Sequence, residues 1–182
     1  MRIVGGTHRG RIFEPGKHFK ARPTTDMAKE SLFNILQNSI DFESIRALDL
    51  FAGTGSISYE LASRGVPDVT AVEINAAHIH FIKEVVEKLG EKGIRVVKSN
   101  VFVFTKRIDE QFDLIFADPP YDHPKFGEVA DLIFNNKLLK PDGLFILEHS
   151  AKYDYSKHPN FKELRRYGSV HFSLFTSEPN EG

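Results

Sequence analysis

Five short apolar runs separated by helix-like segments constrain the fold of this chain more than any other feature. The runs are apolar nearly throughout, which is typical of parallel strands whose two faces are both covered. A repeated strand–helix–strand pattern predicts an open, mostly parallel sheet with helices on both faces, an α/β fold. The predicted strands are 45–51, 69–73, 94–98, 112–117 and 144–148, and the predicted helices between them are 56–64, 75–89 and 126–139.

Both ends of the chain extend this pattern. Residues 26–36 have an apolar face with helical spacing, and Pro23 is a start signal just before them, so a further helix is expected there. After the last apolar run, 162–167 and 170–176 flank Gly168 and predict a hairpin. This hairpin would add a C-terminal antiparallel pair to the sheet.

Composition limits the class of protein. The chain has 182 residues and no internal repeat or linker-like stretch, which suits a single domain over residues 1–182. It has no cysteine, which excludes disulfides and cysteine-based metal or nucleophile chemistry. No apolar run approaches the roughly 18 residues of a membrane helix, and the N-terminus lacks the apolar core of a signal peptide. We therefore expect a soluble, cytoplasmic monomer.

Charge is unevenly distributed along the chain. The net charge is −1, but residues 1–25 contain six basic residues and one acidic residue, a net charge of +5. The rest carries 18 basic and 24 acidic residues, a net charge of −6. A basic arm on an acidic body is expected when one end of a chain meets a polyanion. A solvated, partly disordered terminus would have the same composition, and charge alone does not separate the two.

Acidic and glycine residues follow the first two predicted strands. Asp49 ends the first strand, Gly53 and Gly55 lie in the turn after it, and Glu73 ends the second strand. Glycine lets a ligand approach the backbone closely. An acidic residue at the end of the second strand can accept hydrogen bonds from both ribose hydroxyls. Because ligands of open α/β sheets bind outside the carboxyl ends of the strands, these residues predict a nucleoside site.

The same segment indicates which nucleoside is bound. The dinucleotide fingerprint needs a third glycine where this chain has Ser58, and the Walker phosphate-binding pattern is absent. An acidic strand end before a short Gly-x-Gly turn suits a cofactor with no phosphate and a cationic amino-acid tail, as in S-adenosylmethionine. After the third strand, Asn100 is a candidate for the adenine amine, with Val101 or Phe102 against the ring. The predicted cofactor residues are Asp49, Phe51, Gly53, Gly55, Glu73, Ile74, Asn100 and Val101.

Each cofactor signal has a plain structural alternative when taken alone. Gly53 and Gly55 also suit a tight strand-to-helix turn, and Asn100 also suits an ordinary turn. The combination with two acidic strand ends favours the cofactor site.

Asp118-Pro119-Pro120-Tyr121, directly after the run 112–117, carries the strongest chemical signal. A base amine is a poor nucleophile because its lone pair is delocalised into the ring. Accepting hydrogen bonds from its two N–H groups exposes that lone pair, and the Asp118 side chain and the Pro119 carbonyl are the candidate acceptors. The prolines fix φ and remove competing donors, so these acceptors are preorganised.

Tyr121 is expected to stack on a base that has left its helix or loop. The four residues therefore predict methyl transfer from a sulfonium to an exocyclic amine, with much of the rate coming from positioning. Without a cofactor site beside it, Asp-Pro-Pro would also serve as a simple strand terminator.

Metal catalysis is not expected. The eight histidines show no ligand-like spacing except His78 and His80, which point apart on a helix. His149 near a strand end is expected to be a structural or rim residue. Asp68 and Asp113 are expected to be ordinary loop and strand-start residues.

Together, these residues resemble the bacterial 16S ribosomal RNA guanine-N2 methyltransferase family, which has a Rossmann-like class I S-adenosylmethionine-dependent methyltransferase fold. The Arg-Pro-Thr stretch beside the Leu-Phe-Asn helix is the more diagnostic part, because adenine-N6 and other amino-group methyltransferases share Asp-Pro-Pro-Tyr. The resemblance covers most of the chain. Its matching segments are 1–6, 9–11, 22–26, 30–36, 48–53, 63–65, 72–73 and 118–121.

The resemblance implies S-adenosylmethionine-dependent methylation of a guanine N2 in 16S rRNA, either free or in an assembled small subunit. It implies that the N-terminal arm holds RNA phosphates, which supply most non-specific affinity. The chain departs from the family in lacking an aromatic near His8, an Arg near Lys29 and an Asp at Asn100. The implied RNA-binding residues are Arg9, Arg11, Lys20 and Arg22.

Two alternatives belong to other classes. A DNA adenine-N6 methyltransferase would use the same Asp-Pro-Pro-Tyr platform, but such enzymes usually carry a sizeable target-recognition insertion, and the longest candidate segment here is too short. A non-catalytic RNA-binding module would bind RNA without affinity for the cofactor. The intact set Asp49, Gly53, Glu73 and Asp118 argues against the second alternative.

Overall fold

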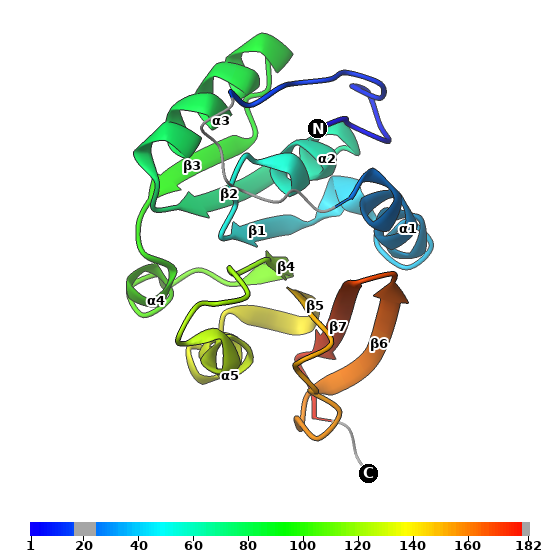
Figure 1. Ribbon diagram of the computed structural model, residues 1–182, viewed down its shortest axis with the longest axis vertical. Coiled ribbons are helices and arrows are strands. Elements are labelled where there is room, and N and C mark those ends of the chain that lie inside the picture. The colour runs from blue at the N-terminus through cyan, green and yellow to red at the C-terminus, as the bar shows by residue number, and fades with distance from the viewer. Residues whose placement is uncertain (17–24, 180–182) are drawn as a thin grey trace.

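The computed structural model describes residues 1–16 and 25–179. Its strands are β1 Arg46–Leu50, β2 Asp68–Glu73, β3 Ile94–Lys98, β4 Phe112–Ala117, β5 Leu139–His149, β6 Phe161–Tyr167 and β7 Val170–Thr176. They form one sheet of order β3-β2-β1-β4-β5-β7-β6. The first five strands are parallel, and β7 pairs antiparallel with both β5 and β6. The predicted α/β sheet with a C-terminal antiparallel hairpin is confirmed (Figure 1).

Helices cover both faces of the sheet (Figure 1). They are α1 Asp26–Leu36, α2 Ser56–Ser63, α3 Ala76–Leu89, α4 Val101–Phe104 and α5 Val129–Asn135. Apolar residues of α1, α2 and α3 form one buried cluster with one face of the sheet. Residues of α5 form a second cluster with the other face. Each parallel strand contributes to both clusters or lies between them, which explains why its run is apolar nearly throughout.

Two elements of the structure differ from the elements predicted from the sequence. The predicted helix 126–139 is a 3-10 turn, Phe126–Glu128, followed by the shorter α5, and Lys137 beyond it has a left-handed φ of 52°. The last parallel strand, β5, starts at Leu139 rather than at residue 144, because it continues across Pro-Asp-Gly with Asp142 at φ 60°. The short helix α4 was also not predicted.

The first residues of the chain pack against α2. Ile3 N–H donates to the Arg11 carbonyl at 3.0 Å, so residues 1–13 fold back on themselves. Val4 N–H donates to Glu60 Oε2 at 2.8 Å, and Ile3 is 1% exposed. The described part of the predicted basic arm therefore packs against the body of the protein. Lys20, Arg22 and the start signal Pro23 lie outside the described residues. Thr25 caps the N-terminus of α1: its hydroxyl accepts from the Ala28 N–H at 3.2 Å.

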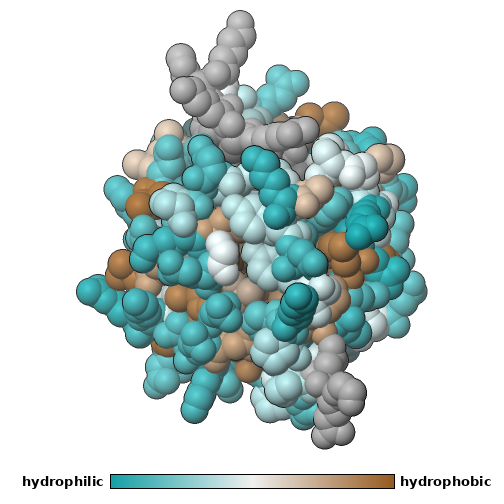
Figure 2. Space-filling model, turned by 60° about the horizontal axis from the view of Figure 1, so that its bottom comes forward, coloured by the Kyte–Doolittle hydropathy of each residue, from teal (hydrophilic) through white to brown (hydrophobic). Residues whose placement is uncertain are grey.

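The face of the molecule shown in Figure 2 is mostly polar. Figure 2 shows one face on which hydrophilic residues surround small, separate hydrophobic patches. Within residues 1–16 and 25–179, none of the helices combines the length and the apolar character that crossing a bilayer requires. The exposed large hydrophobic residues of the described chain are Ile12, Met27, Ile74 and Val103.

Candidate active site

A cavity of about 830 Å³ opens at the carboxyl ends of β1, β2, β4 and β5. The sheet order changes direction at β1, which lies between β2 and β4, and ligands of open α/β sheets bind at such a switch. Gly55 alone among the predicted cofactor and target residues does not line the cavity. The predicted residues that line it are Asp49, Phe51, Gly53, Glu73, Ile74, Asn100, Val101, Asp118, Pro119, Pro120 and Tyr121.

The turn between β1 and α2 needs its glycines. Gly53 and Gly55 have φ of 54° and 81°, in the left-handed region that favours glycine. A Cβ at Gly55 would also lie 2.6 Å from the Tyr59 hydroxyl, so no side chain fits there. Gly55 therefore lets the turn pack closely against Tyr59 without lining the cavity, whereas Gly53 lines the cavity.

Glu73 is fixed at the cavity wall by backbone donors. Its Oε2 accepts from Gly53 N–H at 2.8 Å, and its Oε1 accepts from the N–H groups of Ile74 and Asn75 at 2.9 and 2.8 Å. A carboxylate has about four acceptor sites, so these three bonds leave room for a ligand hydroxyl. This arrangement fits the ribose-binding role predicted for Glu73.

Asp49 is a buried acid at the floor of the cavity. It is 2% exposed, and its Oδ2 accepts from the Ser58 N–H at 3.1 Å and the Ser58 hydroxyl at 2.6 Å. Burial raises the pKa of Asp49 to about 7, the Ser58 bonds oppose that rise, and the negative charge of Glu73 adds to it. Among the described residues Asp49 has no ion-pair partner, so a ligand with a cationic group fits beside it.

The third strand leads into an aromatic wall. Asn100 caps α4 by accepting from the Phe102 N–H at 2.9 Å, so its side-chain oxygen is already engaged in a cap. The Phe102 ring stacks on His123 at 5.2 Å, and Phe51 meets both rings edge-on. His123 was missed in the sequence, although it follows the tyrosine of the target motif by two residues. A flat apolar ring fits against this wall, next to Val101.

The four residues after β4 form a braced platform. The Tyr121 ring meets Phe126 edge-on at 6.2 Å, and Tyr153 stacks on Phe126 at 4.0 Å. The Tyr153 hydroxyl donates to the Tyr121 carbonyl at 3.3 Å. Within the described part of the chain, the Pro119 carbonyl receives no hydrogen bond, whereas the Pro120 carbonyl accepts from His123. The Pro119 oxygen is therefore available as an acceptor, and its role toward a target amine stays a prediction.

Asp118 begins this platform and is partly buried. Its N–H donates to the Leu50 carbonyl at 3.3 Å, which ties it to β1. Burial raises the pKa of Asp118 well above its usual value, and the negative charges of Glu148 and Asp49 raise it further. Such an acid is a stronger proton acceptor than an ordinary aspartate once it is ionised.

Sequence reasoning also missed Glu148, a cavity residue at the end of β5. It follows the apolar run 144–147 as Asp118 follows 112–117, so the same signal was present. Its neighbour His149 is fully buried between the Ser150 carbonyl at 2.9 Å and the Ser173 hydroxyl at 2.7 Å. His149 is therefore structural, as predicted.

Of the predicted RNA-binding residues, the two that the structure describes, Arg9 and Arg11, do not line the cavity. Arg9 and Arg11 are exposed on the docked N-terminal segment, and Arg11 donates to the Lys88 carbonyl at the end of α3. Lys20 and Arg22 lie outside the described residues. In the ranges that the structure covers, no three metal-ligating side chains gather in one place. His78 lines the cavity, while the His80 side chain is 79% exposed.

Comparisons with known proteins agree with this architecture. The family described as "Conserved hypothetical protein 95" matches residues 1–176. "Ribosomal RNA small subunit methyltransferase D" of Escherichia coli K12 is 30% identical over 98% of this chain and 90% of its own length. The solved structure of "Putative methyltransferase yhhF from Escherichia coli" superposes with a TM-score of 0.84 at 29% identity, covering 99% of both chains.

A more distant solved structure is a T. thermophilus 16S rRNA N2 methyltransferase in complex with AdoMet and guanosine. Its TM-score is 0.69 at 22% identity, and the match covers 87% of this chain and 45% of that one. At this identity the likeness shows the fold alone, which is that of class I methyltransferases.

Proposed function

Since this chain belongs to the Conserved hypothetical protein 95 family, we propose that it is an S-adenosylmethionine-dependent methyltransferase that modifies the N2 amine of a guanine in 16S ribosomal RNA. One observation carries the proposal. A single cavity brings together Asp49 and Glu73, which suit the cofactor, and the platform 118–121, which suits an exocyclic amine.

The cavity residues that follow β1, β2 and β3 fit S-adenosylmethionine. Glu73 would accept a hydrogen bond from a ribose hydroxyl, and Asp49 would lie toward the cationic amino-acid tail. Ile74, which is 59% exposed at the rim, and Val101 would hold the adenine ring. When bound, this cofactor supplies a methyl group on a positively charged sulfur. Phosphate-binding features are absent from the described turn, which agrees with a cofactor that has no phosphate.

The platform residues would orient the target amine. The Asp118 carboxylate and the Pro119 carbonyl would accept its two N–H groups, and Tyr121 would stack on the base. Because these acceptors are fixed by β1 and by the Tyr121–Phe126–Tyr153 packing, they need little reorganisation during the reaction. The amine loses a proton after methyl transfer, and the raised pKa of Asp118 suits that side chain to receive it.

The substrate proposed is rRNA in the assembled small subunit. Relatives named as small-subunit rRNA methyltransferases support an RNA target. The net charge of −1 gives the chain little general attraction to a naked polyanion. A ribosomal particle would offer protein contacts as well as phosphates. The DNA adenine-N6 alternative is not favoured, because none of these relatives is named for it.

The test is methyl transfer from labelled S-adenosylmethionine to three substrates: unmodified 16S rRNA, reconstituted small subunits and duplex DNA. We expect label in subunits, recovered as N2-methylguanine and lost in Asp118→Ala. The matched control Asp109→Ala changes an exposed aspartate before β4 and should keep full transfer. Label as N6-methyladenine in DNA, or no label with the cofactor bound, would overturn the proposal.

A further inference from the structure

Strand register places a second acid beside the target platform. Asp49 of β1 lies opposite Phe116 of β4, and Phe116 lies opposite Ile146 of β5. Side chains of a strand return to the same face every second residue. Asp118 and Glu148 each come two residues after this row, so they are neighbours on the same face of the sheet. Both line the cavity.

Glu148 is held in place and faces the platform. It is 4% exposed, and its Oε1 accepts from the Tyr121 hydroxyl at 3.4 Å. Its negative charge is the largest cause, after burial, of the raised pKa of Asp118. A carboxylate can accept about four hydrogen bonds through its two oxygens, so Glu148 can accept from a ligand as well as from its protein partners. Glu148 thus brings a buried acceptor to the space where the base would lie.

The platform by itself does not distinguish guanine from adenine. Its two acceptors and its aromatic ring recognise an exocyclic amine on a flat base, and both bases have one. The bases differ at the ring nitrogen next to that amine: N1 of guanine carries a hydrogen, whereas N1 of adenine is an acceptor. A second acceptor beside the platform would accept a hydrogen bond from N1–H of guanine, whereas it would repel the N1 lone pair of adenine.

We propose that Glu148 is a specificity-determining residue that accepts the N1–H of the target guanine while Asp118 and Pro119 hold its N2 amine. This inference rests on the proposed function and adds the group that selects the base. A buried polar group left unpaired by the wrong substrate disfavours that substrate strongly. One good contact to a base edge gives about 10- to 100-fold discrimination.

A narrower role for Glu148 is to hold the Tyr121 hydroxyl. The two roles separate in Tyr121→Phe, which removes the hydroxyl and keeps the carboxylate. If Glu148 served only Tyr121, this variant would change base preference as much as Glu148→Gln does. We expect Tyr121→Phe to slow transfer and to leave base preference unchanged.

The test uses small subunits reconstituted with rRNA that carries either guanine or 2-aminopurine at the nucleotide that takes the label. 2-Aminopurine keeps the amine at position 2, but its N1 is an acceptor. We expect the wild-type protein to prefer guanine by about 10- to 100-fold in kcat/KM. Glu148→Gln should reduce this ratio about tenfold or more, because the carboxamide nitrogen can donate to N1 of 2-aminopurine. The missing O6 of 2-aminopurine affects both proteins equally and cancels in the comparison.

The matched control is Glu128→Gln, which makes the same change at an exposed residue before α5 and should keep the wild-type ratio. Cofactor affinity of each variant reports whether its fold is intact. Equal use of the two bases by the wild type, or an unchanged ratio in a folded Glu148→Gln, overturns the inference while N2-methylguanine formation upholds the proposed function. Failure of the wild type to form N2-methylguanine overturns both.

Discussion

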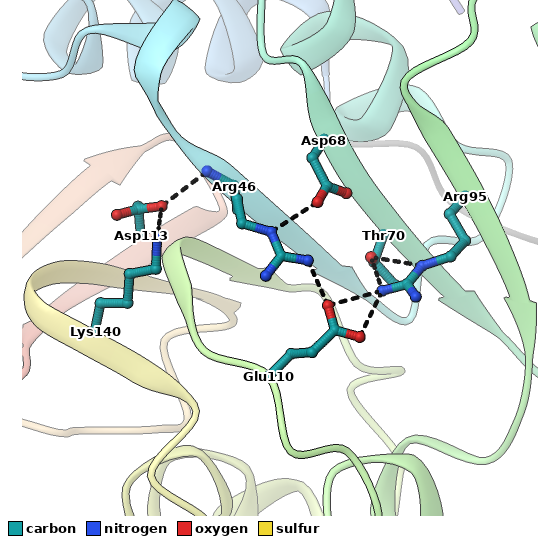
Figure 3. Close-up of polar contacts among 7 residues, drawn as sticks. All are labelled: Arg46, Asp68, Thr70, Arg95, Glu110, Asp113 and Lys140. Carbon is teal, nitrogen blue, oxygen red and sulfur yellow. Dashed lines mark hydrogen bonds and ion pairs between the residues drawn. The ribbon is translucent and has the colours of Figure 1, made fainter.

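The amino ends and the carboxyl ends of the parallel strands both carry acidic side chains, but these side chains differ in whether they have basic partners. At the amino ends each acid meets a basic partner (Figure 3): Arg46 Nε lies 2.7 Å from Asp68, and Lys140 Nζ lies 2.8 Å from Asp113. At the carboxyl ends, Asp49 and Asp118 have no ion-pair partner among the described residues. We call the amino ends the paired end, and we call the carboxyl ends the unpaired end because Asp49 and Asp118 lie there, although His78 Nδ1 lies 3.7 Å from Glu73 at the same end.

The pKa values follow this division. Hydrogen bonds from Arg46 lower the pKa of Glu110, and Arg95 adds to the effect. Burial would raise the pKa of Asp113, but its bonds to Lys140 and to the Arg46 N–H outweigh burial and lower it. At the other end, burial raises the pKa of both Asp49 and Asp118. The paired end contributes to the stability of the sheet, and the unpaired end keeps charge that a ligand can satisfy.

The largest expected effect contrasts the two ends of β4. Asp118→Asn replaces one acceptor oxygen at the platform with a donor, so we expect kcat to fall about 10²- to 10³-fold. Asp113→Asn makes the same change at the paired end of the same strand and should leave kcat within about twofold. Single-turnover methyl transfer measures the rates, and thermal unfolding measures stability. Asp113→Asn should lower the melting temperature because it breaks the bond to Lys140. Equal losses of kcat in both variants would contradict a division of labour between the ends.

The second effect concerns cofactor affinity. Asp49→Asn removes the buried carboxylate that would face a cationic ligand tail, and we expect the Kd for S-adenosylmethionine to rise roughly 10- to 100-fold. The unliganded variant should be as stable as the wild type or more so, because a buried unpaired charge is unfavourable. Calorimetric titration measures the affinity. Asp68→Asn, at the paired end of the neighbouring strand, is the control and should bind the cofactor normally.

The third effect is a pH dependence with a defined sign. The pKa of Asp49 is raised to about 7 in the folded protein, so more of Asp49 becomes ionised as pH rises from 6 to 7. A cationic ligand binds the ionised form, and affinity should therefore rise about fivefold over this range. Asp49→Asn should flatten the profile. A steep profile that survives this substitution would assign the titration to another group.

The acids at the two ends make the free energy of unfolding depend on pH in opposite directions. Between the ordinary aspartate pKa of 3.8 and about 7, the folded protein binds more protons at Asp49 than the unfolded chain does, so this residue lowers stability as pH rises. Asp113 has a lowered pKa in the folded state. Its contribution to stability is present above its unfolded pKa and is lost as pH falls through its folded pKa.

The sequence predicts the parts of this molecule that depend on local pattern. The strand cores were predicted because each run is apolar nearly throughout. Asp49, Glu73 and Asp118 were singled out because each is an acid near, at or directly after the end of such a run. Glu148 has the same signal, but it was taken only as the last residue of the predicted strand 144–148 and not as a site residue. The structure separates this residue from His149: Glu148 faces the cavity and His149 is buried between β5 and β7.

The parts that were missed depend on contacts between distant segments. The bond between Val4 and Glu60 spans 56 residues, and nothing local to either residue indicates it. The pairing of Arg46 with Glu110 spans 64 residues. Asp68 and Asp113 were interpreted as ordinary loop and strand-start residues, and only the register of β1, β2 and β4 shows that they flank the same arginine. Periodicity shows which face of an element is buried, but not which polar groups meet at its ends.

The smallest expected effect tests the paired end directly. Arg46→Met removes the guanidinium that lies between Asp68 and Glu110 (Figure 3). The Arg46 side chain is 36% exposed, so water and salt screen these pairs, and we expect a loss of about 0.5–1 kcal/mol in the free energy of unfolding. Because Arg46 is at the opposite end of β1 from the cavity, kcat and cofactor affinity should not change. Urea unfolding at low and high salt measures the effect, which should shrink as salt rises. A loss of kcat without a loss of stability would mean that the two ends of the sheet are coupled rather than independent.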